Sequence, residues 1–260
     1  MHSNYTLKEN LVKRKLSSGE YCFGIFATIP FPTIPEIVGY AGFDFVIIDM
    51  EHGVMDFESV ENVVRAADNL GVTSVIRVPE ARESYILRAL ETGAQGIQVP
   101  HVEDKDTAKY VVESIKYAPL GHRGVSPYTR AANYSSLSPI EHFRKSNEET
   151  LVVLQIEGRE GVENIESIAS VEGVDVLFAG PYDLSQSFGV AGDVDNPMVK
   201  QSMSRLIETC KRYRKWPGTF APNIERAKNW ISAGMKYLAY SVDTGIFYES
   251  LRRIIEAIKL

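Results

Sequence analysis

Several features are scarce or missing in this sequence of 260 residues. It has only two cysteines, Cys22 and Cys210, and their spacing does not resemble that of a metal site. A disulfide framework is therefore not expected, and buried thiols are the default. No apolar run approaches the roughly 18 residues that a membrane span requires. The first residues also lack the apolar segment of a signal peptide, so we expect a cytoplasmic protein with no membrane partner.

Excess positive charge is also missing. The chain has 28 Lys and Arg against 34 Asp and Glu, which gives a net charge of −6. A nucleic-acid-binding surface would instead show clustered, unbalanced Lys and Arg. A short basic cluster within residues 211–215 lies at the end of a helical pattern, where cations suit the helix dipole. We therefore expect no nucleic-acid partner.

Two families of ligand-binding motif are missing as well. Neither a Gly-x-x-x-x-Gly-Lys loop nor a Gly-x-Gly-x-x-Gly fingerprint occurs, so nucleotide-dependent chemistry has no support. The five histidines form no His-x-His or His-x-x-x-His pair, which disfavours a zinc centre of the hydrolase kind.

What the sequence does contain is a regular alternation of short apolar segments and amphipathic segments. Eight segments are predicted to be strands: 22–28, 45–49, 74–78, 96–99, 151–156, 174–179, 216–220 and 237–241. Amphipathic helices are predicted over 34–40, 57–70, 85–92, 104–117, 162–170, 197–214, 224–233 and 246–258. Continuously apolar strands separated by helices indicate a parallel sheet covered on both faces. Eight such units close most simply into one (β/α)8 TIM barrel, a single domain over residues 1–260.

Two segments fall outside this repeat. A helix over about residues 7–16 precedes the first strand. Residues 118–150 form a long connection before the fifth strand, and connections of that length tend to be functional or to carry extra structure.

Active sites of such barrels gather at the C-terminal ends of the strands. Eight polar residues follow or end predicted strands there: Asp49, Glu51, His52, Arg77, His101, Gln155, Glu157 and Asp183. No lysine lies within a predicted strand, which disfavours an aldolase of the Schiff-base type, because that chemistry needs a desolvated lysine inside the barrel.

Glu157 and Asp183 are the most informative pair. Each ends an apolar run, and their separation is about one strand-helix unit, so both can emerge on one rim of the sheet. Paired carboxylates suit Mg²⁺ or Mn²⁺, which prefer oxygen ligands and leave positions for water and substrate. The structural alternative is that both acids cap the helices that follow them.

The remaining rim residues allow functional and structural interpretations. Arg77 ends a strand, so its guanidinium should face the barrel mouth. There it could bind an oxyanion or form a structural ion pair with one of the acids at the strand ends. An Asp49–His52 contact would hold the imidazole as a base in one tautomer, or would be structural. We expect His101 only to line the pocket. The stretch 180–185 reads as a turn that opens a short helix, whose free N–H groups at Tyr182 and Asp183 can bind an anion.

Taken together, six stretches of the chain resemble the HpcH/HpaI aldolase family. They are 47–53 (IIDMEHG), 77–79 (RVP), 93–96 (GAQG) with 99–100 (VP), 122–125 (HRGV), 155–157 (QIE) and 180–185 (GPYDLS). The resemblance covers nearly the whole chain, from about Phe26 to residues 242–244. It implies a metal-dependent, class II aldolase that reversibly cleaves a 4-hydroxy-2-oxo acid into pyruvate and an aldehyde.

The resemblance also implies roles for individual residues. Glu157 and Asp183 would bind Mg²⁺ or Mn²⁺, with Co²⁺ as a third candidate, and Gln155 and Gly180 would line this site. Arg77 would stabilise the pyruvate enolate. The Asp49–His52 pair would act through a water as base on the 4-hydroxyl group. The backbone N–H groups of Tyr182 and Asp183 would hold the pyruvate carboxylate.

Three positions depart from the family pattern. Glu91 stands where members commonly place an Asp that reaches the catalytic His of a neighbouring subunit. Phe26 stands where some members have Trp, and His101 where others have Met, so the aldehyde pocket is expected to differ.

The resemblance implies homo-oligomers as well, often hexamers built as trimers of dimers that exchange a C-terminal helix. The apolar stripe of residues 246–260 can pack on its own barrel or on a partner's. Two alternatives to the aldolase stay open: an acyl-CoA lyase like the citrate lyase β subunit, and a catalytically silent barrel that binds 2-oxo acids. No basic surface for a nucleotide stands out, and only Glu91 favours the silent barrel.

Overall fold

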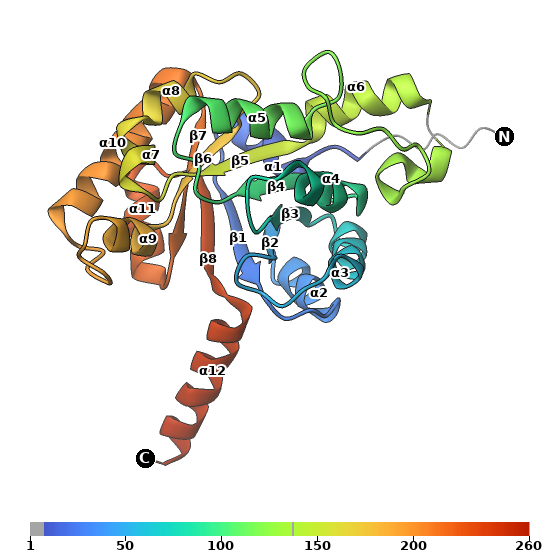
Figure 1. Cartoon of the computed structure of the whole chain (residues 1–260). Coiled ribbons are helices and arrows are strands. Elements are labelled where there is room, and N and C mark those ends of the chain that lie inside the picture. The colour runs from blue at the N-terminus through green and yellow to red at the C-terminus, as the bar shows by residue number, and fades with distance from the viewer. Residues whose placement is uncertain (1–7, 137, 260) are drawn as a thin grey trace.

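A computed structural model of the chain describes residues 8–136 and 138–259. Its centre is a closed barrel of eight parallel strands in chain order, with β1 pairing with β8 (Figure 1). The strands are β1 (Cys22–Ala27), β2 (Phe45–Asp49), β3 (Thr73–Arg77), β4 (Gly96–Val99), β5 (Leu151–Gln155), β6 (Val176–Ala179), β7 (Trp216–Ala221) and β8 (Tyr237–Val242). The predicted barrel is therefore confirmed.

Helices surround the barrel and return the chain from the end of one strand to the start of the next (Figure 1). They are α1 (Leu11–Ser17), α2 (Thr33–Tyr40), α3 (Phe57–Asn69), α4 (Glu83–Glu91), α5 (Lys105–Ile115), α6 (Pro139–Glu149), α7 (Arg159–Glu163), α8 (Ile165–Ala169), α9 (Pro181–Ser187), α10 (Pro197–Tyr213), α11 (Ile224–Ala233) and α12 (Asp243–Ile258), with a 3₁₀ segment η1 (Arg130–Ser135).

Side-chain caps fix where several helices begin. Asn10, Asp56, Asp104 and Asn223 each accept a hydrogen bond from the backbone N–H three residues later, which satisfies one free donor of the first turn. For this reason α1 begins at Leu11, whereas the sequence pattern predicted a helix from about residue 7, which lies outside the described residues.

The predicted helix over residues 162–170 forms instead as two short helices, α7 and α8. They meet at Asn164, whose backbone (φ −93°, ψ 5°) ends the first helix and starts the second. The side-chain amide of Asn164 donates to the carbonyl of Glu103. This tertiary contact holds the chain at the break, and helical periodicity does not reveal it.

The strands are continuously apolar because both of their faces are buried. Inside the barrel, the rings of Phe45 and Tyr237 stack with centroids 4.0 Å apart. Gly24 lies beside them, and a Cβ there would come within 2.2 Å of the Phe45 ring. Outward side chains such as Val46 and Ile48 are buried by the helix layer. This core holds the strand ends, and thus the rim residues, in fixed positions.

The long connection at 118–150 carries extra structure, as its length predicted, in the form of η1 and α6. The buried Lys116 anchors α6: its Nζ donates to the carbonyls of Asn147 (2.7 Å) and Thr150 (3.0 Å). Burial lowers the pKa of Lys116 to about 8.

The last helix, α12, extends away from the barrel (Figure 1). Asp243 is its only buried residue among those described. Its exposed large apolar side chains are Phe247, Tyr248, Leu251, Ile254, Ile255 and Ile258. None of the helices in the described ranges is long and apolar enough to cross a membrane.

Candidate active site at the barrel mouth

A cavity of about 310 Å³ opens at the C-terminal ends of the strands. It is lined by Phe26, Thr28, Asp49, His52, Arg77, Gln155, Glu157, Phe178, Gly180, Asp183, Phe220 and Val242. Eight of the twelve residues that the sequence singled out are among them, and Glu51, Glu91, His101 and Tyr182 are not. The lining residues come from seven of the eight strands or the segments that follow them, so the barrel alone brings them together.

Arg77 forms a two-point ion pair with Asp49. Its Nε donates to Asp49 Oδ1 (3.0 Å) and its Nη2 to Asp49 Oδ2 (2.6 Å). Its Nη1 lies 3.0 Å from Glu51 Oε2. The strands set up the pair, because Asp49 and Arg77 occupy the same register position of β2 and β3. A guanidinium has five N–H groups, so the two hydrogen bonds to Asp49 leave one on Nη2 and both on Nη1, which lies beside Glu51.

Asp49 contacts His52 through the backbone. Its Oδ1 accepts the N–H groups of Glu51 (3.0 Å) and His52 (3.2 Å), which shapes the loop after β2. The side chain of His52 is exposed and lines the cavity. The residues predicted to form a pair are thus neighbours at the mouth, with the carboxylate of Asp49 directed to Arg77.

Glu157 is held in the cavity by buried polar neighbours. Its Oε2 accepts a hydrogen bond from Gln155 Nε2 (2.7 Å), and its Oε1 accepts the backbone N–H of His101 (2.9 Å). Gln155 is oriented in turn by Gln98, a buried residue of β4 that donates to its side-chain carbonyl. Burial raises the pKa of Glu157, and the nearby carboxylate of Asp183 raises it further. A bound cation would relieve both costs.

Gly180 leaves open the space between the two acids. A Cβ at this position would lie 2.6 Å from Asp183 Oδ2 and 3.4 Å from Glu157 Oε2. Both oxygens therefore border the same small volume, which a side chain would fill. Two carboxylate oxygens facing one open volume fit a hard divalent cation. The residues present thus fit the predicted metal.

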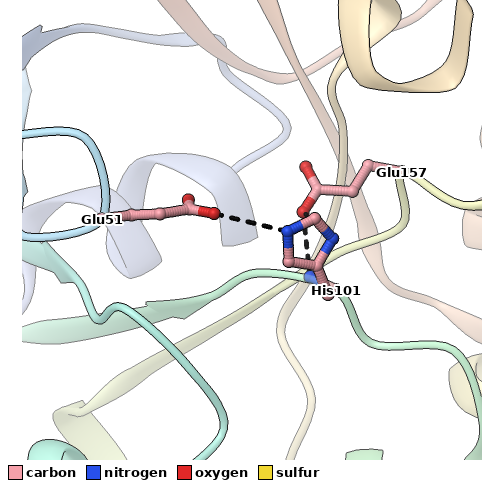
Figure 2. A group of neighbouring side chains, drawn as sticks. All are labelled: Glu51, His101 and Glu157. Atoms are coloured by element: carbon pink, nitrogen blue, oxygen red, sulfur yellow. Dashed lines mark hydrogen bonds and ion pairs between the residues drawn. The ribbon is translucent and has the colours of Figure 1, made fainter. Parts of the chain in front are cut away.

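A second cluster of metal-capable ligands adjoins Glu157. Glu51, His101 and Glu157 each offer one ligand atom, and these atoms lie within 4.8 Å of one another. Figure 2 shows the two carboxylates approaching His101 from opposite sides. His101 Nδ1 lies 3.2 Å from Glu157 Oε1, and Nε2 lies 3.5 Å from Glu51 Oε1. Burial raises the pKa of Glu51 as well.

Aromatic rings form one wall of the cavity. Phe26 stacks under the guanidinium of Arg77, 4.7 Å from ring centroid to Cζ, and packs edge-on against Phe178 and Phe220. Tyr182 does not line the cavity; its exposed ring packs edge-on against Phe220.

Glu91 lies outside the cavity of its own chain. It ends α4, and it lines a separate hollow with residues of α3 and η1. Its Oε1 accepts a hydrogen bond from the buried Arg123 (3.0 Å), whose guanidinium covers the ring of Tyr117.

Sequence reasoning missed two residues that position the site. Gln98, in the middle of an apolar strand, orients Gln155, and a buried amide within such a run was the available signal. Asp243 accepts four hydrogen bonds from Thr28 and Ile29, three of them from Thr28, and so fixes the loop after β1 at the mouth. No sequence pattern links residues 215 positions apart.

The fold and the polar mouth place the molecule among the β/α barrels with an acid-lined site for a small ligand. The family model for HpcH/HpaI aldolase/citrate lyase matches residues 23–250. The chain is 31% identical over 250 residues to a 5-keto-4-deoxy-D-glucarate aldolase of Enterobacter sp. (strain 638), covering 96% of this chain and 97% of that protein.

Two solved structures are similar over almost their whole length. One is an HpcH/HpaI aldolase/citrate lyase family protein from Burkholderia cenocepacia J2315, with a TM-score of 0.92, 29% identity, and coverage of 97% of this chain and 100% of that one. The other is the citrate synthase SbnG, with a TM-score of 0.86, 30% identity, and coverage of 95% and 96%. The chain belongs to the HpcH/HpaI aldolase/citrate lyase family, and its relatives indicate a carbon–carbon lyase.

Proposed function

We propose that this protein is a metal-dependent class II aldolase that reversibly cleaves a 4-hydroxy-2-oxo acid into pyruvate and an aldehyde. The observation that supports this most is the single cavity that joins the acids Glu157 and Asp183 to the Arg77–Asp49 pair. Family membership gives the reaction class.

In this proposal Glu157 and Asp183 hold Mg²⁺ or Mn²⁺, with Co²⁺ as a third candidate. When bound, the cation would act as a Lewis acid on the 2-oxo acid and stabilise negative charge as it develops. Gly180 keeps the space between the two carboxylates free, and Gln155 holds Glu157 in place. The backbone N–H groups of Tyr182 and Asp183 would bind the pyruvate carboxylate.

Arg77 would stabilise the enolate that carbon–carbon cleavage leaves behind. Its remaining N–H groups are held in position by the contacts of the guanidinium to Asp49 and Glu51 and by the ring of Phe26. A donor that is fixed before the reaction needs no reorganisation as the charge grows, which is where electrostatic catalysis gains most.

His52 would take the proton from the 4-hydroxyl group through a water. Breaking the bond between C3 and C4 turns this hydroxyl into the aldehyde carbonyl, and the bond electrons pass to the pyruvate fragment as the enolate. Protonation of the enolate at C3 then gives pyruvate. The exposed imidazole at the cavity edge can exchange its proton with solvent between these steps.

A sugar acid is the first substrate class to test. The relative's substrate, 5-keto-4-deoxy-D-glucarate, is a 2-oxo acid with a hydroxyl in the position that this cleavage requires. Its products would be pyruvate and a three-carbon aldehyde acid. Phe26 and His101 border the mouth of this chain, so the preferred aldehyde is expected to follow from these two side chains.

The similarity to a citrate synthase supports a second direction for the same chemistry, in which the enolate adds to a carbonyl compound. The acyl-CoA lyase and the silent barrel are not better supported, because the relative with the curated name is an aldolase.

We further propose that the chain assembles into a homo-oligomer through α12, with a hexamer built as a trimer of dimers as the expected form. Six large apolar side chains of this helix are exposed in the single chain. Burying each one against a partner would contribute about 1.5 to 3 kcal/mol.

Exchange of the methyl protons of pyruvate in deuterated water tests the aldolase proposal without an aldehyde. We expect exchange, followed by proton NMR, to need added Mg²⁺, Mn²⁺ or Co²⁺ and to stop with a chelator. Glu157→Gln should abolish it, whereas Glu80→Gln, an exposed acid paired with Arg82, should not. Robust exchange in the presence of chelator would contradict the proposal.

A further inference from the structure

His101 has a defined position above Glu157, although it is exposed. It follows β4 and adopts a left-handed backbone conformation, with φ of 52°. Its backbone N–H donates to Glu157 Oε1, and the next N–H, of Val102, donates to the carbonyl of Gln155 (3.1 Å). The turn is therefore bound to β5 on both sides of the imidazole, which directs the ring toward the acids.

The two oxygens of Glu157 face different neighbours. Its Oε2 borders the space beside Gly180 and Asp183, and its Oε1 faces the imidazole Nδ1 at 3.2 Å. The far ring nitrogen of His101 is 3.5 Å from Glu51 Oε1. Glu157 thus belongs to two sets of possible metal ligands. One is the carboxylate pair with Asp183, and the other is the group with His101 and Glu51, which includes a nitrogen ligand.

The spacing fits coordination after a small movement. Three ligands of one ion, each about 2.1 Å from it, are at most about 3.6 Å apart when they are evenly spaced. The three ligand atoms of Glu51, His101 and Glu157 lie within 4.8 Å of one another, so a closure of about 1 Å or slightly more is enough. The exposed imidazole can make this movement without disturbing the core.

We propose that His101 is a nitrogen ligand of the metal held by Glu157, with Glu51 completing the group, and that it shifts the preference of this protein from Mg²⁺ toward Co²⁺, Ni²⁺ or Zn²⁺. Carboxylates alone suit Mg²⁺ and Mn²⁺, whereas an imidazole raises the affinity for the later transition metals. The inference rests on the proposed metal-dependent function, and it adds a residue that determines which metal is used.

Metal affinities measured on the whole protein test this inference without an activity assay. Isothermal titration with Co²⁺ and with Mg²⁺ should show that His101→Met weakens Co²⁺ binding by at least about tenfold. The same variant should change Mg²⁺ binding by no more than about twofold, because Mg²⁺ rarely takes nitrogen ligands. His101→Asn, which tolerates the left-handed backbone, separates loss of the imidazole from backbone strain and should weaken Co²⁺ binding equally.

A spectroscopic measurement identifies the ligand directly. In the Co²⁺-loaded protein, the N–H proton of a coordinating imidazole gives a strongly shifted resonance that disappears in deuterated water. We expect one such resonance, lost in His101→Met and retained in the control His122→Gln, whose side chain is exposed on a different loop.

Two results would overturn the inference: a resonance that persists in His101→Met, or equal weakening of Co²⁺ and Mg²⁺ binding in that variant. Both differ from failure of the proposed function, in which the wild-type protein itself would bind neither metal and Glu157→Gln would change nothing.

Discussion

Arg77 and Asp49 form a buried, two-point ion pair between equivalent positions of β2 and β3, with N–O distances of 3.0 and 2.6 Å. Removal of one member of a buried pair leaves the other charge without its partner, which is costly in a low-dielectric surrounding. The pair therefore contributes to stability and also fixes the guanidinium at the mouth.

The variant Asp49→Ala measures how much the Arg77–Asp49 ion pair contributes to stability. We expect the free energy of unfolding, from urea titration, to fall by about 3 kcal/mol, because Glu51 is then the only carboxylate left in contact with Arg77. Glu80→Ala breaks the exposed Arg82–Glu80 pair and should cost less than about 1 kcal/mol. Similar losses in the two variants would show that the buried pair contributes no special stability.

In the proposed mechanism His52 and Arg77 act in different steps: His52 deprotonates the hydroxyl group, and Arg77 stabilises the enolate. His52→Ala should slow retro-aldol cleavage by about 100-fold or more, since it removes a general base. It should affect pyruvate proton exchange much less, because Arg77, Glu157 and Asp183 remain. Proton NMR follows exchange, and coupled pyruvate release follows cleavage. Equal loss of both activities would refute this assignment.

Gly180 should matter for metal binding through the space that it leaves open. A methyl group from Gly180→Ala would meet Asp183 Oδ2 at 2.6 Å, and the backbone (φ −89°, ψ 105°) accepts alanine, so steric contact is the only change. We expect Mn²⁺ affinity, measured by titration, to fall by about tenfold or more. Gly245→Ala, where a Cβ makes only ordinary contact, is the control. Unchanged affinity in Gly180→Ala would place the metal elsewhere.

Assembly through α12 can be tested by placing charge on its apolar face. Leu251→Asp combined with Ile255→Asp should shift the protein to a smaller species in sedimentation velocity, because both side chains are exposed in the isolated chain. Arg253→Ser, on the same helix, should leave the assembly intact. A wild-type protein that sediments as a monomer would exclude this role for the helix.

The buried Lys116 is expected to make the free energy of unfolding increase with pH. Its pKa in the folded protein is about 8, below the usual 10.5, so the unfolded chain binds the proton more tightly. Burying the charged amine therefore lowers the free energy of unfolding. This cost is fully present below pH 8 and disappears as the pH rises toward 10.5. The free energy of unfolding of the wild type should therefore rise by about 2 kcal/mol between pH 8 and pH 10, relative to Lys116→Met. Parallel pH profiles from urea titration would contradict this.

Much of the fold was predictable because the repeat is local. Each strand is apolar on both faces, and each following helix has one apolar face. The sequence pattern therefore predicts eight strand-helix units without any knowledge of their tertiary contacts. The break at Asn164 could not, because it depends on a hydrogen bond to the carbonyl of Glu103, more than 60 residues earlier.

For the site, the sequence by itself determined which residue types stand at the strand ends. Glu157, Asp183, Arg77 and Asp49 could be chosen because a parallel barrel directs all strand ends to one mouth. Only the tertiary structure decided how they pair. The carboxylate of Asp49 faces Arg77, His52 lies exposed at the edge of the cavity, and His101 contacts Glu157 and Glu51. The physical reason is that strand position follows from local periodicity, whereas side-chain partners depend on register and loop turns that join residues distant in the chain.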